Sequence, residues 1–199
     1  MKKDNSTFSS KRSDRLKTLQ EIDIPVVMET HGGWGKVFAS CYSPYEGCVF
    51  ENDRVKADFL ASQRPGWAVY RGDAEKAIRL GAGSHLGINL LDCDPYGSPW
   101  PYISAFFETR RSFEPIMAVV ANDGMRHKLK RGASWSCEVL RDACNKMSQR
   151  DVYEKYNEIV LDLMVKITSQ AGYKLRKWFC YYTGDKQAMT HYAAILKMG

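Results

Sequence analysis

Four apolar segments in the first half of the chain each lead to an acidic residue, and they recur at an almost constant spacing. The segments cover residues 24–28, 47–50, 67–70 and 86–91, and the acids are Glu29, Glu51, Asp73 and Asp94. Successive acids lie 22, 22 and 21 residues apart, which is enough for a strand, a short helix and two loops. Helix-compatible stretches at 33–39, 54–62 and 74–80 fill the intervals. Apolar strands that alternate with helices predict a parallel sheet covered on both faces.

The acids mark the edge of this sheet where a ligand is expected. In open parallel sheets the ligand lies beyond the carboxyl ends of the strands. Alternatively, an acid at such a position only caps the N-terminus of the next helix, and one or two of the four could do no more than that. The common spacing favours a ligand site. We therefore predict Glu29, Glu51, Asp73 and Asp92 as cofactor-binding residues and Asp94 as a catalytic residue.

The second half of the chain predicts a fifth strand and a closing hairpin. A helix is expected after Ser98, which is placed as its N-cap with Pro99 and Pro101 in the first turn. A fifth strand follows at 115–121, and residues 135–171 have helical periodicity. Segments 174–182 and 187–196 flank a tight turn that contains Gly184, which predicts an antiparallel hairpin. The hairpin separates this α/β fold from an ordinary nicotinamide-binding one.

Length and composition indicate one domain. The chain has 199 residues, of which 44% are hydrophobic, so it can bury one good-sized core. Residues 1–20 are polar and basic and are expected to form a mobile tail that becomes a short helix near Leu16 and Leu19, with the single domain at 21–199. No apolar run reaches the length of a membrane span and the N-terminus lacks the apolar core of a signal peptide, so a cytoplasmic location without membrane contact is expected.

The six cysteines show no Cys-x-x-Cys pair and no zinc spacing, so we expect reduced thiols and no metal site. Three of them, Cys48, Cys93 and Cys180, lie inside apolar segments, where a thiol behaves as a small hydrophobe. The net charge of +6 is mild, and it permits a polyanionic partner without requiring one.

A glycine-rich turn follows the first strand and indicates a nucleotide-like ligand. Gly33 and Gly35 let the backbone approach a ligand closely, although such turns serve many cofactors. Glu51 lies where a carboxylate can accept from both hydroxyls of a ribose, which favours an adenosine-containing ligand without a 2′-phosphate. Asp73 could accept from the adenine amine, cap the helix that begins at Ala74, or do both.

Residues 92–99 are typical of a reaction centre for an amino group. The lone pair of an amine on a nucleobase is delocalised, and a carboxylate and a rigid carbonyl that accept its hydrogens can localise it. Asp94 and the Pro95 carbonyl can supply these acceptors, and Tyr96 can stack on the base. Gly97 and Ser98 are predicted to line the substrate site. The alternative is a purely structural turn before the next helix.

Over residues 24–198 this pattern resembles the class I methyltransferase family. The resemblance implies a Rossmann-like three-layer sandwich, a seven-stranded sheet whose last strand is antiparallel, and S-adenosylmethionine bound across its first half. Gly33, Gly35, Glu51 and Asp73 match the family's cofactor positions, whereas His31 replaces its first glycine.

Residues 94–99, Asp-Pro-Tyr-Gly-Ser-Pro, are similar to the tRNA (guanine-N2)-dimethyltransferase family, although this chain has no room for that family's extra C-terminal domain. They also resemble the Asp/Asn-Pro-Pro-aromatic signature of methyltransferases that act on nucleobase amines.

A basic run after the fifth strand suggests that the partner is RNA, and tRNA-like molecules are among the candidates. Its members, predicted to bind phosphates beside the target base, are Arg126, Lys128, Lys130 and Arg131. Three functions remain open: methylation of a nucleobase amine, methylation of a small molecule or protein, and a cofactor-binding relic that serves in an assembly. Intact Glu51 and Asp94 argue against the relic.

Overall fold

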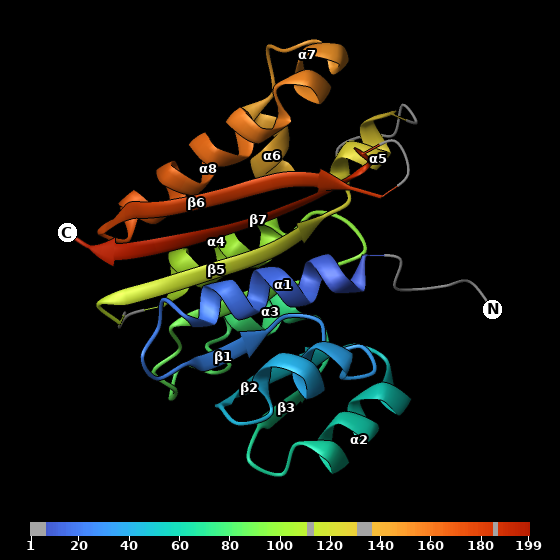
Figure 1. The fold of residues 1–199 in the computed structure, drawn as a ribbon, viewed down its shortest axis with the longest axis vertical. Helices are drawn as coiled ribbons and strands as arrows, with labels where there is room; N and C mark the ends of the chain where they lie inside the picture. Colours follow the sequence, from blue (N-terminus) through green and yellow to red (C-terminus); the bar gives the residue numbers. More distant parts are fainter. Residues whose placement is uncertain (1–6, 111–113, 131–136, 185–186) are drawn as a thin grey trace.

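The computed structural model describes residues 7–110, 114–130, 137–184 and 187–199, and these fold around one seven-stranded sheet (Figure 1). The strand order is β3-β2-β1-β4-β5-β7-β6. The strands are β1 (Val26–Glu29), β2 (Glu46–Glu51), β3 (Ala68–Arg71), β4 (Leu90–Cys93), β5 (Ile116–Asp123), β6 (Tyr173–Thr183) and β7 (Met189–Met198). Strands β1 to β5 run parallel to one another, and β7 pairs antiparallel with both β5 and β6. The predicted Rossmann-like three-layer α/β fold with a closing antiparallel hairpin is confirmed.

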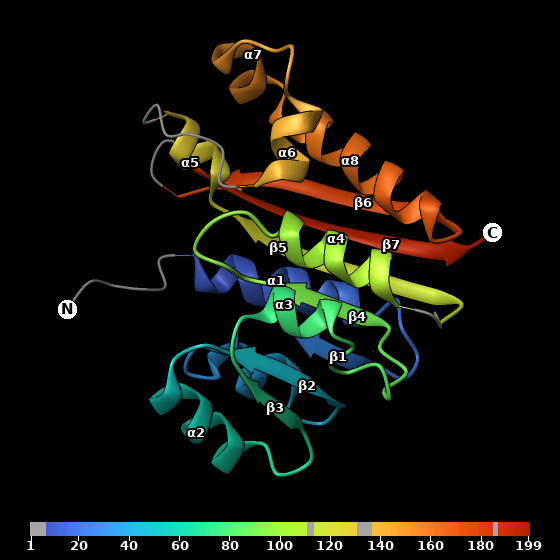
Figure 2. The same ribbon diagram turned by 180° about the vertical axis from the view of Figure 1, so that it is seen from behind.

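Helices cover both faces of the sheet, as Figures 1 and 2 show from opposite sides. One face carries α1 (Phe8–Leu19), the π-helix η1 (Phe38–Tyr42) and α2 (Arg54–Gln63). The other carries α3 (Ala74–Arg79), α4 (Trp100–Thr109), α6 (Glu138–Ala143), α7 (Gln149–Glu154) and α8 (Tyr156–Gln170), while α5 (Met125–Lys130) follows β5. Each face has its own apolar core, because side chains alternate between the two faces along every strand.

The strand register places the ends of β1 and β4 side by side. Val27 pairs with Leu90, and Glu29 pairs with Asp92. Strand β4 begins at Leu90, four residues later than expected, because the preceding residues form turns in which the Leu86 N–H donates to the Gly83 carbonyl. The alternation of strands and helices is otherwise as predicted.

The N-terminal region differs from the expected mobile tail. Helix α1 already begins at Phe8, and it packs across the sheet beside β5 and β7. Its inner face buries Asp14, Arg15 and Thr18 as well as Leu19. A helix that buries mostly polar side chains lacks the apolar periodicity that would reveal it in the sequence.

Two further helices start differently from the expectation. The helix predicted at 33–39 is displaced toward the C-terminus and contains the π-helical turn η1. Helix α4 has Pro99 rather than Ser98 as its N-cap, and the Ser98 hydroxyl instead accepts from the Trp100 N–H at 3.4 Å. Between 137 and 171 the predicted helical region consists of α6, α7 and α8.

All six cysteines are free, and five of them are buried. Among the described residues, no helix is both long and apolar enough to cross a bilayer.

Candidate active site

The carboxyl ends of β1 and β4 bring the predicted cofactor and reaction segments together. Beyond the last paired residues, the Thr30 N–H still donates to the Asp92 carbonyl at 2.9 Å, so the parallel ladder continues by one step. His31 follows Thr30 on the first segment, and Cys93 and Asp94 follow Asp92 on the second. The charges of Asp94, Glu51, Asp92 and Asp73 act on His31, whereas Glu29 is paired with Arg64.

Two of the predicted cofactor ligands, Glu29 and Asp92, have internal partners. The Asp92 carboxylate accepts from Nε and Nη2 of Arg15 at 2.6 and 2.5 Å and from the Tyr42 hydroxyl at 2.7 Å. Glu29 is paired with Arg64, and both side chains are almost fully buried. Burial raises the pKa of Glu29 to about 7, although the charge of Arg64 acts in the opposite direction. These carboxylates therefore hold helices and loops in place, and a direct contact with a cofactor stays a prediction.

The glycine turn is held by the third predicted cofactor ligand, Glu51. Gly33 and Gly35 have φ angles of +52° and +69°, a region that glycine adopts without strain. One carboxylate oxygen of Glu51 accepts from the Gly33 N–H at 2.8 Å, and the other accepts from the Asp53 N–H at 2.9 Å. Each oxygen keeps lone pairs, and the side chain is half-buried at the end of β2. Glu51 can therefore hold the turn and still accept from a ligand hydroxyl.

Asp73 caps the next helix, as one of its two predicted roles required. Its carboxylate accepts from the Lys76 N–H at 2.9 Å at the start of α3. The residue is exposed, so a ligand can also reach it. Burial raises the pKa of Tyr102 to about 12, and the charge of Asp73 adds to this effect.

Asp94 is bound by the N-terminal helix. Lys11 Nζ lies 2.7 Å from both oxygens of the Asp94 carboxylate, which is 21% exposed. Burial raises the pKa of Asp94, but the charges of Arg15 and Lys11 outweigh burial and hold the pKa below its usual value. Asp94 is therefore an ionised, partly accessible acceptor, and the contribution of α1 to this site was not predicted.

The segment after Asp94 forms a tight loop with one exposed aromatic ring. Pro95, Gly97 and Ser98 are buried, whereas Tyr96 is 88% exposed. The Gly97 carbonyl accepts from the Gly124 N–H at 2.9 Å, which joins this loop to the end of β5. The loop thus presents Tyr96 to the outside, as a stacking platform would require.

His31, which was not among the predicted site residues, lies between the glycine turn and the segment that carries Asp94. Its ring packs edge-on against Tyr102, with centroids 4.7 Å apart and an interplanar angle of 84°. Its Nδ1 lies 2.9 Å from the Thr30 hydroxyl. Burial lowers the pKa of His31 below its ordinary value, and Asp94 and Glu51 offset only part of that effect. Its place beside the glycine turn was the one signal in the sequence.

The basic run behaves differently from the prediction at Arg126. This side chain is 6% exposed, and its guanidinium lies between the rings of Tyr153 and Tyr182. It donates to the Gln187 carbonyl at 2.7 Å and so ties α5 to the hairpin. The expectation of a phosphate contact at Arg126 is therefore corrected, because the charge is used internally.

The other basic residues of the run have mixed outcomes. Lys128 lies near the reaction loop, with its Nζ 3.2 Å from where a Cβ on Gly97 would be. The Lys130 side chain and Arg131 fall outside the part of the chain that the structure describes. Of the four, Lys128 is thus the one that the described structure brings to the site.

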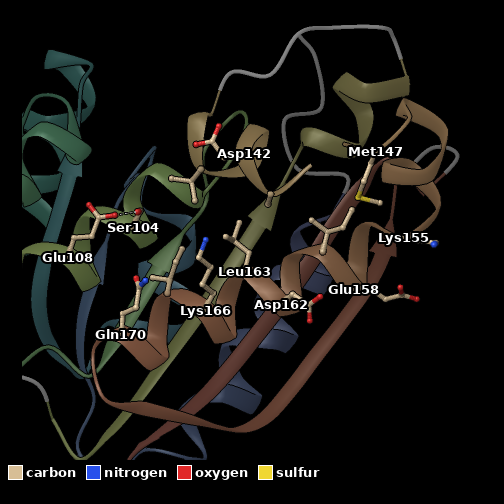
Figure 3. Close-up of a pocket in the computed structure, with 14 residues that line it drawn as sticks. Ser104, Glu108, Asp142, Met147, Lys155, Glu158, Asp162, Leu163, Lys166 and Gln170 are labelled. Carbon is tan, nitrogen blue, oxygen red and sulfur yellow. Dashed lines mark hydrogen bonds between the residues drawn. The ribbon is translucent and has the colours of Figure 1, made fainter. Parts of the chain in front are cut away.

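A groove of about 570 Å³ lies elsewhere, between α4, α6 and α8 (Figure 3). Glu108, Asp142 and Lys166 are among the residues that line it, and no predicted site residue does so. The groove is therefore distinct from the carboxyl edge of the sheet.

Comparison with known proteins identifies the fold. No protein-family model matches the sequence, and no curated protein matches it. Among solved structures, TYW2 from M. jannaschii in complex with AdoMet matches with a TM-score of 0.60 and 9% identity, over 100% of this chain and 79% of that chain. The N-methyltransferase NodS from Bradyrhizobium japonicum matches with a TM-score of 0.60 and 8% identity, over 98% of this chain and 99% of that chain. The plantazolicin methyltransferase BamL, solved with SAH, matches with a TM-score of 0.58 and 10% identity, over 96% of this chain and 84% of that chain.

These three proteins share a Rossmann-like methyltransferase fold, and this chain has the same fold.

Proposed function

We propose that the chain is a methyltransferase that uses S-adenosylmethionine. The fold supports this, since matched proteins are solved with AdoMet or SAH. The observation that carries the proposal is the half-buried Glu51 carboxylate beside the positive-φ glycine turn. Its free lone pairs fit the two hydroxyls of an adenosine ribose, and the exposed Asp73 fits the adenine amine. When bound, S-adenosylmethionine supplies an electrophilic methyl group at this edge.

We further propose that the acceptor is an exocyclic amino group of a nucleobase in RNA. Asp94 and the Pro95 carbonyl accept the two amine hydrogens, which localises the nitrogen lone pair, and Tyr96 stacks on the base. Lys11 touches both oxygens of Asp94, yet each oxygen retains a lone pair for an incoming N–H. Lys128, near Gly97, is placed to contact a phosphate beside the base.

Calorimetry tests the cofactor. S-adenosylmethionine should bind in preference to NADPH, because the Glu51 carboxylate would repel a phosphate at the 2′ position of the ribose. Glu51→Ala should weaken binding by about 1–3 kcal/mol, the range for a lost charged hydrogen bond. Glu46→Ala is the matched control, since Glu46 is an exposed acid at the other end of β2. Tight NADPH binding without heat from S-adenosylmethionine would overturn the assignment.

Single-turnover transfer from labelled S-adenosylmethionine tests the acceptor. The substrate is total RNA from cells that lack this protein, and mass analysis identifies the modified base. Asp94→Asn should lower the rate by roughly two orders of magnitude with cofactor affinity retained. Asp142→Asn, in the distant groove, is the control and should act like wild type. Label that enters small molecules or proteins instead of RNA would favour the alternative substrate class.

A further inference from the structure

We propose that His31 is a second catalytic residue, whose Nε2 accepts the proton that the target amine loses. The inference rests on the proposed amine methylation. His31 follows the end of β1, directly beside the segment that carries Asp94 after β4. The imidazole therefore lies at the same edge as the predicted acceptor carboxylate.

The proposal requires the tautomer of His31 that carries its hydrogen on Nδ1. The Thr30 hydroxyl can donate its one hydrogen to the Asp92 carbonyl, 3.2 Å away. With that hydrogen so used, the hydroxyl accepts from Nδ1–H across the contact of 2.9 Å. Nε2 is left with a lone pair. Edge-on packing against Tyr102 fixes the plane of the ring and so the direction of this lone pair.

The reaction needs a base that Asp94 is poorly suited to be. An amine that gains a methyl group becomes a cation unless it loses a proton as the new bond forms. Arg15 and Lys11 hold the pKa of Asp94 below its usual value, so its carboxylate can accept a hydrogen bond but is weakly basic. Burial keeps His31 neutral at physiological pH, because it lowers the pKa of the imidazole. An imidazole is ordinarily more basic than a carboxylate, and Lys11 and Arg15 weaken Asp94 further as a base.

The surroundings favour the protonated ring that this step produces. The largest charge effects on His31 come from four carboxylates: Asp94, Glu51, Asp92 and Asp73. A positive charge formed on the imidazole is therefore stabilised by acids from the ends of β2 and β4 and from the start of α3. The same carboxylates would stabilise the positive charge that develops on the amine as the methyl group arrives.

The step balances in atoms and electrons. The nitrogen lone pair forms the new N–CH3 bond while the S–CH3 bond breaks, and its electron pair stays on sulfur, giving S-adenosylhomocysteine. In the same step the N–H bond that faces the Pro95 carbonyl breaks, its electron pair stays on nitrogen and its proton moves to His31 Nε2, so loss of this base slows methyl transfer itself. The imidazolium returns the proton to water, so no oxidant or further reactant is required.

The experiment uses the full chain, labelled S-adenosylmethionine at saturation, and total RNA from cells that lack this protein. His31→Ala should slow single-turnover transfer roughly 100-fold, the scale of lost general-base catalysis, while calorimetry shows retained cofactor affinity. Free imidazole in the buffer should restore part of the rate, which a merely structural role would not allow. His85→Ala is the matched control, because His85 is exposed in the loop before β4.

A second variant guards against a defect in packing. His31→Phe keeps a ring against Tyr102 but has no base. Wild-type rate should rise with pH to a plateau, with the midpoint of the rise below the ordinary histidine pKa, and this rise should disappear in His31→Phe. Wild-type transfer together with unchanged rates and profiles in both variants would refute the role of His31 and leave the proposed function intact. If wild type transferred no methyl group to RNA, the proposed acceptor would fail and this inference with it.

Discussion

Removal of Arg15 should destabilise the whole domain, because this side chain neutralises the carboxylate at the base of the site. Arg15 is fully buried, Asp92 is 3% exposed, and two guanidinium nitrogens lie 2.6 and 2.5 Å from the Asp92 oxygens. Arg15→Met keeps the aliphatic stem but leaves Asp92 buried with only the Tyr42 hydroxyl. Breaking a buried pair from one side costs about 3–5 kcal/mol. For a chain of this length that corresponds to a fall in Tm of roughly 6–20 °C.

Urea unfolding followed by circular dichroism measures this free energy. Arg54→Met is the control: Arg54 and Asp58 form an ion pair at 3.7 Å with side chains 79% and 70% exposed, so the expected loss is below about 0.5 kcal/mol. The double variant Arg15→Met/Asp92→Asn should recover part of the loss, since no uncompensated charge remains. If Arg15→Met were as stable as Arg54→Met, the pair would not anchor α1 and the reasoning would be refuted.

Four further variants separate stability from binding. Because burial raises the pKa of Glu29 to about 7, the folded protein holds this proton more tightly than the unfolded chain does. The resulting stabilisation is fully present below pH 4.5 and is lost as pH rises through about 7. Glu29→Gln should therefore flatten the decline of the wild-type unfolding free energy between these two pH values. Arg126→Met should lower stability by about 2–3 kcal/mol yet leave the salt dependence of RNA binding unchanged, whereas Lys128→Met should reduce that dependence. Tyr96→Ala should leave Tm unchanged but weaken RNA affinity by about 1–3 kcal/mol in a titration, and unaltered affinity would remove Tyr96 from the site.

The order of strands and helices could be predicted because it depends on local patterns. Strands such as β2 and β5 are apolar runs buried on both faces. The interval between one such run and the next along the chain fits one helix. Helix α1 escaped this reasoning because the residues it buries include Asp14 and Arg15, so no apolar stripe identifies its inner face. What stabilises α1 is complementarity to charges on the sheet, and complementarity depends on partners that lie far away in the chain.

The site residues also divide into those that local patterns predict and those that depend on partners far away in the chain. The turn at Gly33 and the half-buried Glu51 follow from positions that any parallel sheet would place at its edge. Which strand-end acids remain accessible depends on whether each carboxylate meets an arginine from another helix. Asp92 meets Arg15, 77 residues away in sequence, and no spacing rule indicates such a pair.

Whether a strand-end acid is buried or accessible follows from where the pairing of β1 with β4 stops. Glu29 and Asp92 are opposite one another within the ladder, so their side chains enter the layer under α1 and α2, where burial demands a cation for each. Asp94 is two residues further on, beyond the last paired residue of β4, and keeps an exposed portion even with Lys11 bound. A shift of the pairing by a single residue would turn these side chains toward the opposite face. The register of β1 against β4 therefore decides which carboxylates build the site and which can act in it.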